Sequence, residues 1–297
     1  MTLRAVLQSM RLPFLLLTPA CVLLGVATAV LGAEAVLWAN LWLALLGALA
    51  GHIAVNTLNE YQDFHSGLDA LTTRTPFSGG SGALLNWPVA AAAVGWAAGL
   101  SLLLVVLVGL YFIAQFGVAI LPIGLLGVAI ILLYTGWVNR RPWLCLVTPG
   151  IAFGPLMVVG THFVLTGHYS LAAAYVSLLP FFLANNLLLL NQYPDVEADR
   201  QVGRRHLPIV YGLGFATRVY GVMLTAAVLV VVLGVMAGAL PAMCLLALFP
   251  AAAGLVAWTG ARRYGHQVAK LGPYLAWNVL AALGTPMTLA ITLMLGG

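Results

Sequence analysis

The chain contains 297 residues, of which 63% are hydrophobic and only 6% are charged, and its mean hydropathy is +1.05. An ordinary soluble domain carries about 25% charged residues, so the composition excludes a soluble globular protein. The net charge of +5 gives no indication of nucleic-acid binding, because the basic residues are distributed as membrane topology requires.

Long apolar runs recur along the whole chain. A helix that crosses a bilayer needs about 20 apolar residues, and these runs are too long and continuous for the strands of a membrane barrel. We therefore predict an all-α integral membrane protein, a nine-transmembrane-helix bundle with a central cavity. The predicted spans are 12–32, 36–59, 87–108, 111–136, 144–166, 170–192, 215–238, 241–260 and 273–295. Ala33-Glu34-Ala35 imitates a signal-peptide cleavage site, but the apolar run from Leu12 to Leu31 is longer than such a signal and is expected to be retained.

The basic residues fix the predicted topology. All twelve fall before the first span or near alternate loops, and therefore on one side of the membrane. The positive-inside rule makes that side cytoplasmic, and we expect the cavity to open there. The twelve are Arg4, Arg11, Arg74, Arg140, Arg141, Arg200, Arg204, Arg205, Arg218, Arg262, Arg263 and Lys270.

Six of the seven acidic residues lie in two short windows, and only Glu34 lies elsewhere. Carboxylates gathered in a partly dry cavity repel one another, by about 4 kcal/mol for a pair 4 Å apart at an effective dielectric constant near 20. The clustering therefore favours bound divalent cations. The windows contain Glu60, Asp63 and Asp69, and Asp195, Glu197 and Asp199.

An Asn-x-x-x-Asp pattern occurs in both windows, at Asn59 and Asp63 and again 132 residues later at Asn191 and Asp195. Four predicted spans separate the copies, so both have the same orientation in the bilayer. This indicates a parallel internal repeat within one membrane domain of residues 1–297, with motifs at 59–69 and 191–199. Transporters also contain repeats, so the duplication alone does not select a function.

Helical spacing arranges these polar residues in stripes, because residues four apart share a face. Polar groups at membrane depth usually face the bundle interior or a wet cavity, although a single Asp could equally solvate a helix end. One stripe contains His52, Asn56, Asn59 and Asp63, and the other contains Asn191, Asp195 and Asp199.

Hard oxygen ligands without Cys or His at metal-binding spacing indicate Mg²⁺, with Mn²⁺ or Ca²⁺ as alternatives. Two facing clusters could hold two magnesium ions around a diphosphate, with arginines adding charge-assisted contacts. The arginines so placed are Arg74, Arg140, Arg141 and Arg200. The glycine-rich residues 76–82 could bring backbone N–H groups to a phosphate, or could be a flexible turn.

A diphosphate bound at the mouth of an apolar bundle suggests an isoprenoid chain lying in the bilayer. Loss of the diphosphate leaves an allylic cation that must be shielded from water. Aromatic faces could stabilise the cation, although interfacial aromatic residues are also common as membrane anchors. The aromatic candidates are Tyr61, Phe64, Tyr134 and Tyr193.

These motifs resemble those of the UbiA-type membrane prenyltransferase superfamily over essentially the whole chain. The first motif is Asn59-Glu60-Tyr61-Gln62-Asp63, followed by Gly67 and Asp69. The second runs from Asn191 to Arg200, followed by Gly203, Arg204 and Arg205. Three stretches are similar to the 1,4-dihydroxy-2-naphthoate branch: Arg11-Leu12-Pro13, Tyr134-Thr135-Gly136 with Arg141-Pro142, and Phe153-Gly154-Pro155-Leu156.

The resemblance implies that Asn59, Asp63, Asp69, Asp195 and Asp199 hold Mg²⁺ and diphosphate. It also implies that Arg74 and Arg141 contact the diphosphate and that Arg11 lies near the acceptor. We take Asn59, Asp63 and Asp195 as the catalytic candidates, add Asn191 to the metal ligands, and assign Asn56 to the substrate cavity. Two departures are Glu60, where the branch usually has Asp, and residues 144–147, where it usually carries an acidic residue.

The leading functional hypothesis is Mg²⁺-dependent transfer of an isoprenyl group to an aromatic acceptor, 1,4-dihydroxy-2-naphthoate or a similar ring, in lipid-quinone synthesis. Terpene cyclisation or another acceptor remains open within the superfamily. A secondary transporter is the alternative from another class, and a phosphatidyl-alcohol transferase ranks lowest because its Asp-Gly-x-x-Ala-Arg run is absent. We expect the inner or plasma membrane of a bacterium or archaeon. Chain length, acceptor and oligomeric state are not determined.

Overall fold

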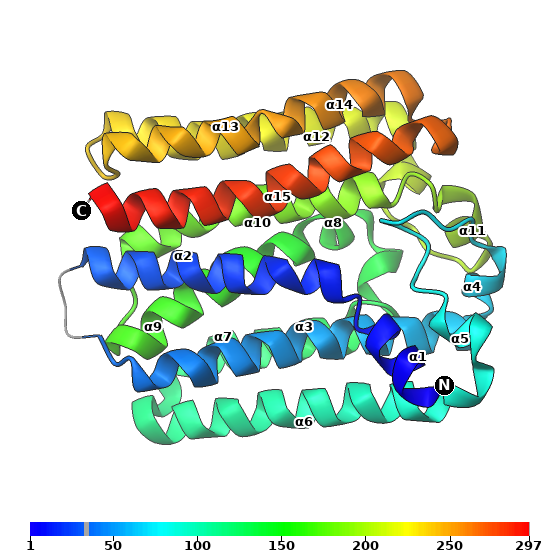
Figure 1. Ribbon diagram of the computed structural model, residues 1–297, viewed down its shortest axis with the longest axis horizontal. Coiled ribbons are helices and arrows are strands. Elements are labelled where there is room, and N and C mark those ends of the chain that lie inside the picture. The colour runs from blue at the N-terminus through cyan, green and yellow to red at the C-terminus, as the bar shows by residue number, and fades with distance from the viewer. Residues whose placement is uncertain (33–35, 297) are drawn as a thin grey trace.

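The fold is a bundle of helices that lie side by side along the long axis of the molecule (Figure 1). The structure, a computed structural model, describes residues 1–32 and 36–296, and that part of the chain contains no strand. The all-α prediction is therefore confirmed. Glu34, with the cleavage-like sequence around it, lies outside the described residues.

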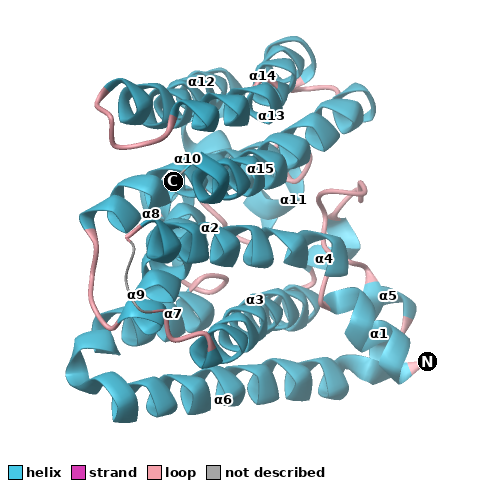
Figure 2. Ribbon diagram, turned by 60° about the vertical axis from the view of Figure 1, so that its left-hand side comes forward, coloured by secondary structure: helices cyan, strands magenta, loops and turns pink. Residues whose placement is uncertain are grey.

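Most of the helices form the body of the bundle, and a group of short helices gathers at the end that carries the N-terminus (Figures 1 and 2). The short helices are α1 (Thr2–Ser9), α4 (Leu68–Leu71), α5 (Ala83–Asn86) and α11 (Val196–Gln201). The helices of the body are α2 (Leu17–Leu31), α3 (Ala39–Ser66), α6 (Ala91–Phe116), α7 (Leu121–Leu133), α8 (Pro142–Ile151), α9 (Gly160–Thr166), α10 (Leu171–Asn191), α12 (Leu207–Met236), α13 (Leu248–Ala251), α14 (Ala253–Tyr264) and α15 (Val268–Gly296).

Eight stretches of the described residues are long and apolar enough to cross a membrane, so the predicted count of nine is not confirmed. The difference lies in residues 88–133, one stretch by length and composition, for which we predicted two spans. This stretch contains α6 and α7, joined by the 3-10 turn Gly117–Ile120. Pro122 stands in the first turn of α7, where its missing N–H breaks no helical hydrogen bond.

One span bends through a π-helix, Ala152–Val159, that lies between α8 and α9. Pro149 and Pro155 lie in this region, and proline removes a backbone donor and crowds the preceding turn. The span also packs closely on α10, since a Cβ on Gly150 would clash with the carbonyl oxygen of Phe181. Small residues allow such close approach between membrane helices, and here they bring the bent span against the centre of the bundle.

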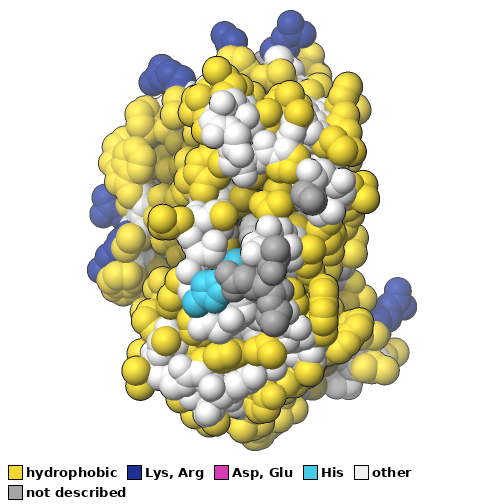
Figure 3. Space-filling model, turned by 90° about the vertical axis from the view of Figure 1, so that its left-hand side faces the viewer, with side chains coloured by type: hydrophobic (Ala, Val, Ile, Leu, Met, Phe, Trp, Pro, Cys, Tyr) yellow, Lys and Arg dark blue, Asp and Glu magenta, His cyan; other side chains and the backbone are white. Residues whose placement is uncertain are grey.

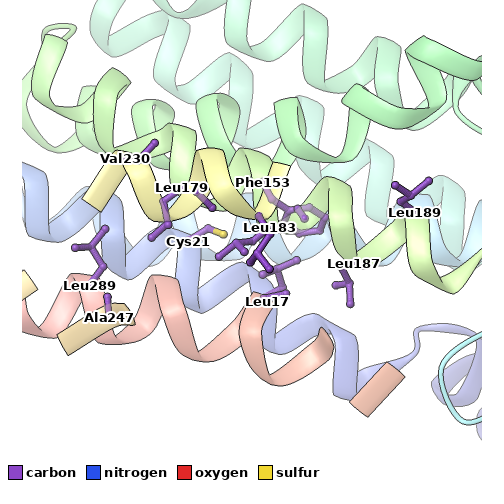
Figure 4. Packing of buried hydrophobic residues seen from close by; sticks show 14 of the residues in the cluster. Leu17, Cys21, Phe153, Leu179, Leu183, Leu187, Leu189, Val230, Ala247 and Leu289 are labelled. Carbon is purple, nitrogen blue, oxygen red and sulfur yellow. The ribbon is translucent and has the colours of Figure 1, made fainter. Parts of the chain in front are cut away.

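The packed core is centred on α10. In its most apolar window 67% of the residues are buried, against 11% in the corresponding window of residues 88–133. Leu179 and Leu183 of α10 lie beside Cys21 of α2 and Phe153 of the π-helix (Figure 4). The outer helix α6 instead leaves side chains such as Trp96 exposed, as a helix that faces lipid does. Polar side chains are costly in contact with lipid, and they lie toward the interior of the bundle and toward the end where the short helices gather.

The two ends of the bundle differ in polarity. The end opposite the N-terminus shows mainly hydrophobic side chains, with Lys and Arg only at the outline and no acidic side chain among the described atoms in view (Figure 3). Both acidic windows lie at the other end, where α3 ends and α11 begins, and α4 contacts α11 there. The segments that carry the two motifs therefore meet.

Candidate active site

A cavity of about 210 Å³ lies between the ends of α3 and α10 and the segments that follow them. Side chains from inside the helices, such as Leu17, Val55 and Phe153, give it an apolar wall, while those from helix ends and loops are polar. Nine of the site residues predicted from the sequence line it. They are Arg11, Asn56, Asn59, Asp63, Asp69, Tyr134, Asn191, Asp195 and Asp199.

The first acidic window turns polar oxygens toward the cavity. Asn59 accepts a hydrogen bond from Arg11 Nη2 over 3.1 Å and donates one to Thr135 Oγ1 over 3.1 Å. Asp69 is buried, and its Oδ2 has no hydrogen-bond partner. Burial, and then the charges of two neighbouring carboxylates, raise the pKa of Asp69 to about 7. The charges of Arg11 and Arg74 offset only part of this rise.

The second window repeats this arrangement from the end of α10. Asp195 Oδ2 accepts a hydrogen bond from the Gly79 N–H over 3.1 Å, whereas its Oδ1 is buried without a partner. The Oδ1 of Asn191 is buried and unpartnered as well. Burial, and then the charge of Asp199, raise the pKa of Asp195 to about 7. Both windows thus hold an acidic group whose ionised form needs further stabilisation.

Arg204 connects the two windows. Its guanidinium donates hydrogen bonds to Asp63 Oδ1 and, over 2.9 Å, to Asp199 Oδ1, while His206 Nε2 lies 2.9 Å from Asp199 Oδ2. The side chains of Arg204, Asp63 and Asp199 are 16%, 9% and 4% exposed, so water screens the ion pairs weakly. Burial by itself lowers the pKa of Arg204, but Asp63 and then Asp199 hold it well above its ordinary value.

The donor set fits magnesium held together with a substrate phosphate. In the part of the cavity wall that the structure describes, buried oxygens without a hydrogen-bond partner belong to Asp69, Asn139, Asn191 and Asp195. Carboxylate and amide oxygens are hard ligands. Among the described residues, no three His, Cys, Asp or Glu side chains come close enough to share one ion. Magnesium rarely occupies an all-protein cage, and one or two carboxylates completed by phosphate and water suffice. The residues present therefore suit an ion that arrives with its substrate.

The four arginines expected at the diphosphate lie on the surface, not in the cavity wall. They are Arg74, Arg140, Arg141 and Arg200. Arg141, for example, lies over the ring of Trp137, with its guanidinium carbon 3.7 Å from the ring centroid. The arginines that line the cavity are Arg11 and Arg204. Proximity in sequence to an acidic motif did not determine which guanidinium faces inward.

Two of the three tyrosines expected at the cavity have other surroundings. Tyr134 lines it. The Tyr61 ring lies 4.2 Å from that of His65, and Tyr193 is buried in the core with its hydroxyl 2.9 Å from Thr217 Oγ1. Neither ring belongs to the cavity lining, so their roles here are packing and hydrogen bonding.

Arg204 and His206 were not among the predicted site residues, because helical periodicity does not reach them. Arg204 follows Asp199 by five positions, beyond the end of α11. Gly203 adopts a positive φ of 78°, which residues with a side chain rarely adopt, and the chain turns back there. The Arg204 N–H then bonds to the Asp199 carbonyl over 3.0 Å. A Gly-Arg pair directly after an acidic motif was the available signal.

The structure is therefore that of a helical membrane protein in which two matched acidic motifs line one cavity. The family model described as the UbiA prenyltransferase family matches residues 16–280, and the chain belongs to this family. The family resemblance predicted from the motifs is therefore confirmed.

Among curated proteins, the chain is 31% identical over 179 residues to the 1,4-dihydroxy-2-naphthoate octaprenyltransferase of Bacillus subtilis (strain 168). The match covers 58% of this chain and 55% of that protein, so it spans little more than half the length of the relative. This is the branch of the family that the sequence resembled.

Solved structures show the same fold at low sequence identity. A digeranylgeranylglyceryl phosphate synthase structure has a TM-score of 0.64 at 13% identity and covers 99% of both chains. A UbiA homologue from Archaeoglobus fulgidus, bound to GPP and Mg²⁺, has a TM-score of 0.62 at 15% identity and covers 95% of this chain and 99% of that one. The same homologue bound to DMAPP and Mg²⁺ has a TM-score of 0.59 at 15% identity, with coverage of 94% and 99%.

Proposed function

We propose that this protein transfers an isoprenyl group from a prenyl diphosphate to an aromatic acceptor. The observation that carries the proposal is the cavity itself, in which unpartnered oxygens of Asp69 and Asp195 face the same space as an apolar wall. The acidic part suits the metal-bound diphosphate and the apolar part suits the hydrocarbon chain. Prenyl diphosphates and Mg²⁺ in the Archaeoglobus fulgidus homologue support this choice of ligands.

We assign the metal to both windows, with two magnesium ions as the expected number. The proposed ligands are Asn59, Asp63, Asp69, Asn191, Asp195 and Asp199. Bound Mg²⁺ supplies positive charge to the diphosphate oxygens and so makes the diphosphate a better leaving group. Arg11 and Arg204 line the same space and would add charge-assisted hydrogen bonds to those oxygens. Arg204 is already ionised, so it needs no proton to take this role.

The apolar wall has two tasks in this proposal. Leu17, Val55 and Phe153 contact the isoprenoid chain and keep water from the carbon that loses the diphosphate. The ring face of Phe153 or Tyr134 stabilises the positive charge that develops on that carbon. Exclusion of water matters because water would otherwise capture the allylic group in place of the acceptor.

The proposed acceptor is 1,4-dihydroxy-2-naphthoate or a similar electron-rich ring, which the name of the Bacillus subtilis relative supports. The ring carbon attacks C1 of the prenyl group as the carbon–oxygen bond to the diphosphate breaks. If the naphthoate is the acceptor, its carboxylate is lost as carbon dioxide during the substitution. Cys145 lines the cavity in the stretch where an acidic residue was expected, so phenolic acceptors are included in the test. We place the site at the cytoplasmic face by the positive-inside rule.

A transfer assay tests the proposal. Purified protein in detergent or nanodiscs receives Mg²⁺, a radiolabelled prenyl diphosphate of 10, 20 or 40 carbons, and a naphthoate, a hydroxybenzoate or no acceptor. We expect labelled prenylated acceptor, lost in Asp63→Asn but retained in Glu197→Gln, whose carboxylate is exposed. A cyclised hydrocarbon made without acceptor would instead support the terpene cyclase alternative. Uptake of unaltered label into sealed vesicles would support a transporter and overturn the proposal.

A further inference from the structure

Glu60 belongs to the first acidic motif, but its carboxylate is not part of the cavity wall. The residue is completely buried, with 0% of its surface exposed. Its Oε2 accepts a hydrogen bond from the Ser81 N–H over 2.9 Å. Its Oε1 accepts from Ser81 Oγ over 2.6 Å and from the Ala83 N–H over 3.1 Å. Every one of these donors belongs to the glycine loop (residues 76–82) or to the first residue of α5.

In the described part of the chain, the cation that forms an ion pair with Glu60 is Arg11. Arg11 Nη2 lies 3.6 Å from Glu60 Oε2, and the same nitrogen donates to Asn59 Oδ1 over 3.1 Å. Arg11 has a φ of 54°, and among the described residues other than glycine it alone has a positive φ. Such a backbone conformation is strained for a residue with a side chain and persists only where the surroundings hold it. Glu60 therefore contacts the glycine loop on one side and a strained Arg11 on the other.

The glycine loop is held against both acidic windows. Gly79 donates its N–H to Asp195 Oδ2 over 3.1 Å, and a Cβ on Gly80 would lie 2.9 Å from Asp69 Oδ1. Both glycines have positive φ, 81° and 72°, and both line the cavity. A backbone this close to the carboxylates is within reach of a phosphate held by them.

We propose that Glu60 is a positioning residue and not a metal ligand. It fixes the glycine loop and Arg11 at the mouth of the cavity, so that the backbone N–H of Gly80 and the Arg11 guanidinium face the bound diphosphate. The identification of the bound ligand as a diphosphate rests on the proposed function. The contacts that Glu60 makes do not depend on it.

Two variants test the proposal by different routes. Glu60→Gln removes the charge and turns an amide N–H₂ toward backbone donors, while Ser81→Ala keeps the charge and removes the 2.6 Å hydrogen bond. The controls are Asp63→Asn, a proposed ligand, and Glu197→Gln, an exposed carboxylate. Calorimetry measures binding of Mg²⁺ alone and of inorganic diphosphate in saturating Mg²⁺. Trypsin cleavage after the exposed Arg74, compared with cleavage after the exposed Arg200 of α11, reports release of the glycine loop.

We expect Glu60→Gln to bind inorganic diphosphate about tenfold or more weakly, the effect of one lost hydrogen bond to a charged group, with a smaller loss for Ser81→Ala. Cleavage after Arg74 should accelerate in both variants while cleavage after Arg200 stays constant. Binding of Mg²⁺ alone should change far less than in Asp63→Asn. If Glu60→Gln loses Mg²⁺ binding as completely as Asp63→Asn, Glu60 is a ligand and the proposal is wrong. Unchanged cleavage and unchanged diphosphate binding in both variants would also overturn it, whether or not the wild-type protein transfers prenyl groups.

Discussion

Replacement of Arg204 by Gln removes the cation that lies between the two acidic windows. Asp199 keeps His206 Nε2 at 2.9 Å, so the loss falls mainly on Asp63, whose side chain is only 9% exposed. Removal of one partner from a buried ion pair lowers the free energy of unfolding by about 3–5 kcal/mol. We expect the metal-free variant to lose an amount of unfolding free energy near the lower end of that range.

Magnesium should restore much of this loss, because a divalent cation at the two windows replaces the missing guanidinium charge. A ligand at 100 times its Kd stabilises a protein by about 2.7 kcal/mol, and removal of the competing guanidinium should make Mg²⁺ bind the variant more tightly. Inorganic diphosphate, in contrast, should bind the variant more weakly, since Arg204 is proposed to contact it. Tighter binding of Mg²⁺ together with weaker binding of diphosphate indicates that Arg204 is a counter-ion that the metal can replace. A general structural defect would instead weaken the binding of both ligands.

The assay is thermal unfolding in detergent, with and without Mg²⁺, together with calorimetry of each ligand. Arg205→Gln is the matched control, because the Arg205 side chain is exposed. The backbone N–H of Arg205, which the substitution retains, donates to the Asn139 carbonyl over 2.9 Å. If Arg204→Gln gains no more stability from Mg²⁺ than the wild type or the control, Arg204 does not occupy the position of the metal charge. That result would refute the reasoning.

Four further predictions concern the carboxylates and the metal. Asp195→Asn should lower kcat/KM for prenyl transfer by about 100-fold or more, since changes beyond the direct ligands already cost about 10–100-fold, whereas Glu197→Gln should stay within about twofold. Equal rates for both variants would contradict the ligand assignment. Chelation by EDTA should abolish transfer and added Mg²⁺ should restore it; full activity after chelation would exclude a required metal. The affinity for Mg²⁺ should rise between pH 6 and 8, because the pKa values of Asp69 and Asp195 are raised to about 7 and their protons must leave before a metal binds. Calorimetry in buffers of different ionisation enthalpy measures that release, and an affinity independent of pH would contradict it. By the same linkage, these groups bind protons in the folded state that the unfolded chain has released, so the metal-free protein should lose stability as the pH rises from about 4 to about 7.

Helical spacing was a good guide to side chains within one helix. Asn56, Asn59 and Asp63 follow one face of α3, and all line the cavity as predicted. Spacing gave no information beyond the helix ends, where Arg204 and His206 lie. Within α3 the same spacing already places Tyr61 off the face that lines the cavity. Tyr61 stands between two of these residues in sequence, yet a helix turns about 100° per residue and carries its ring away from the cavity toward His65.

The amino-acid sequence by itself determined the helical membrane class, the family and the pairing of two acidic motifs, because apolar run length and residue spacing are local properties of a chain. Only the tertiary structure decided which charged groups meet. It brought Arg204 to Asp63 across 141 positions of sequence, turned Glu60 to the glycine loop, and left Arg74, Arg140, Arg141 and Arg200 exposed. The physical reason is that a buried charge needs a partner, and packing between distant segments determines which partner lies within reach.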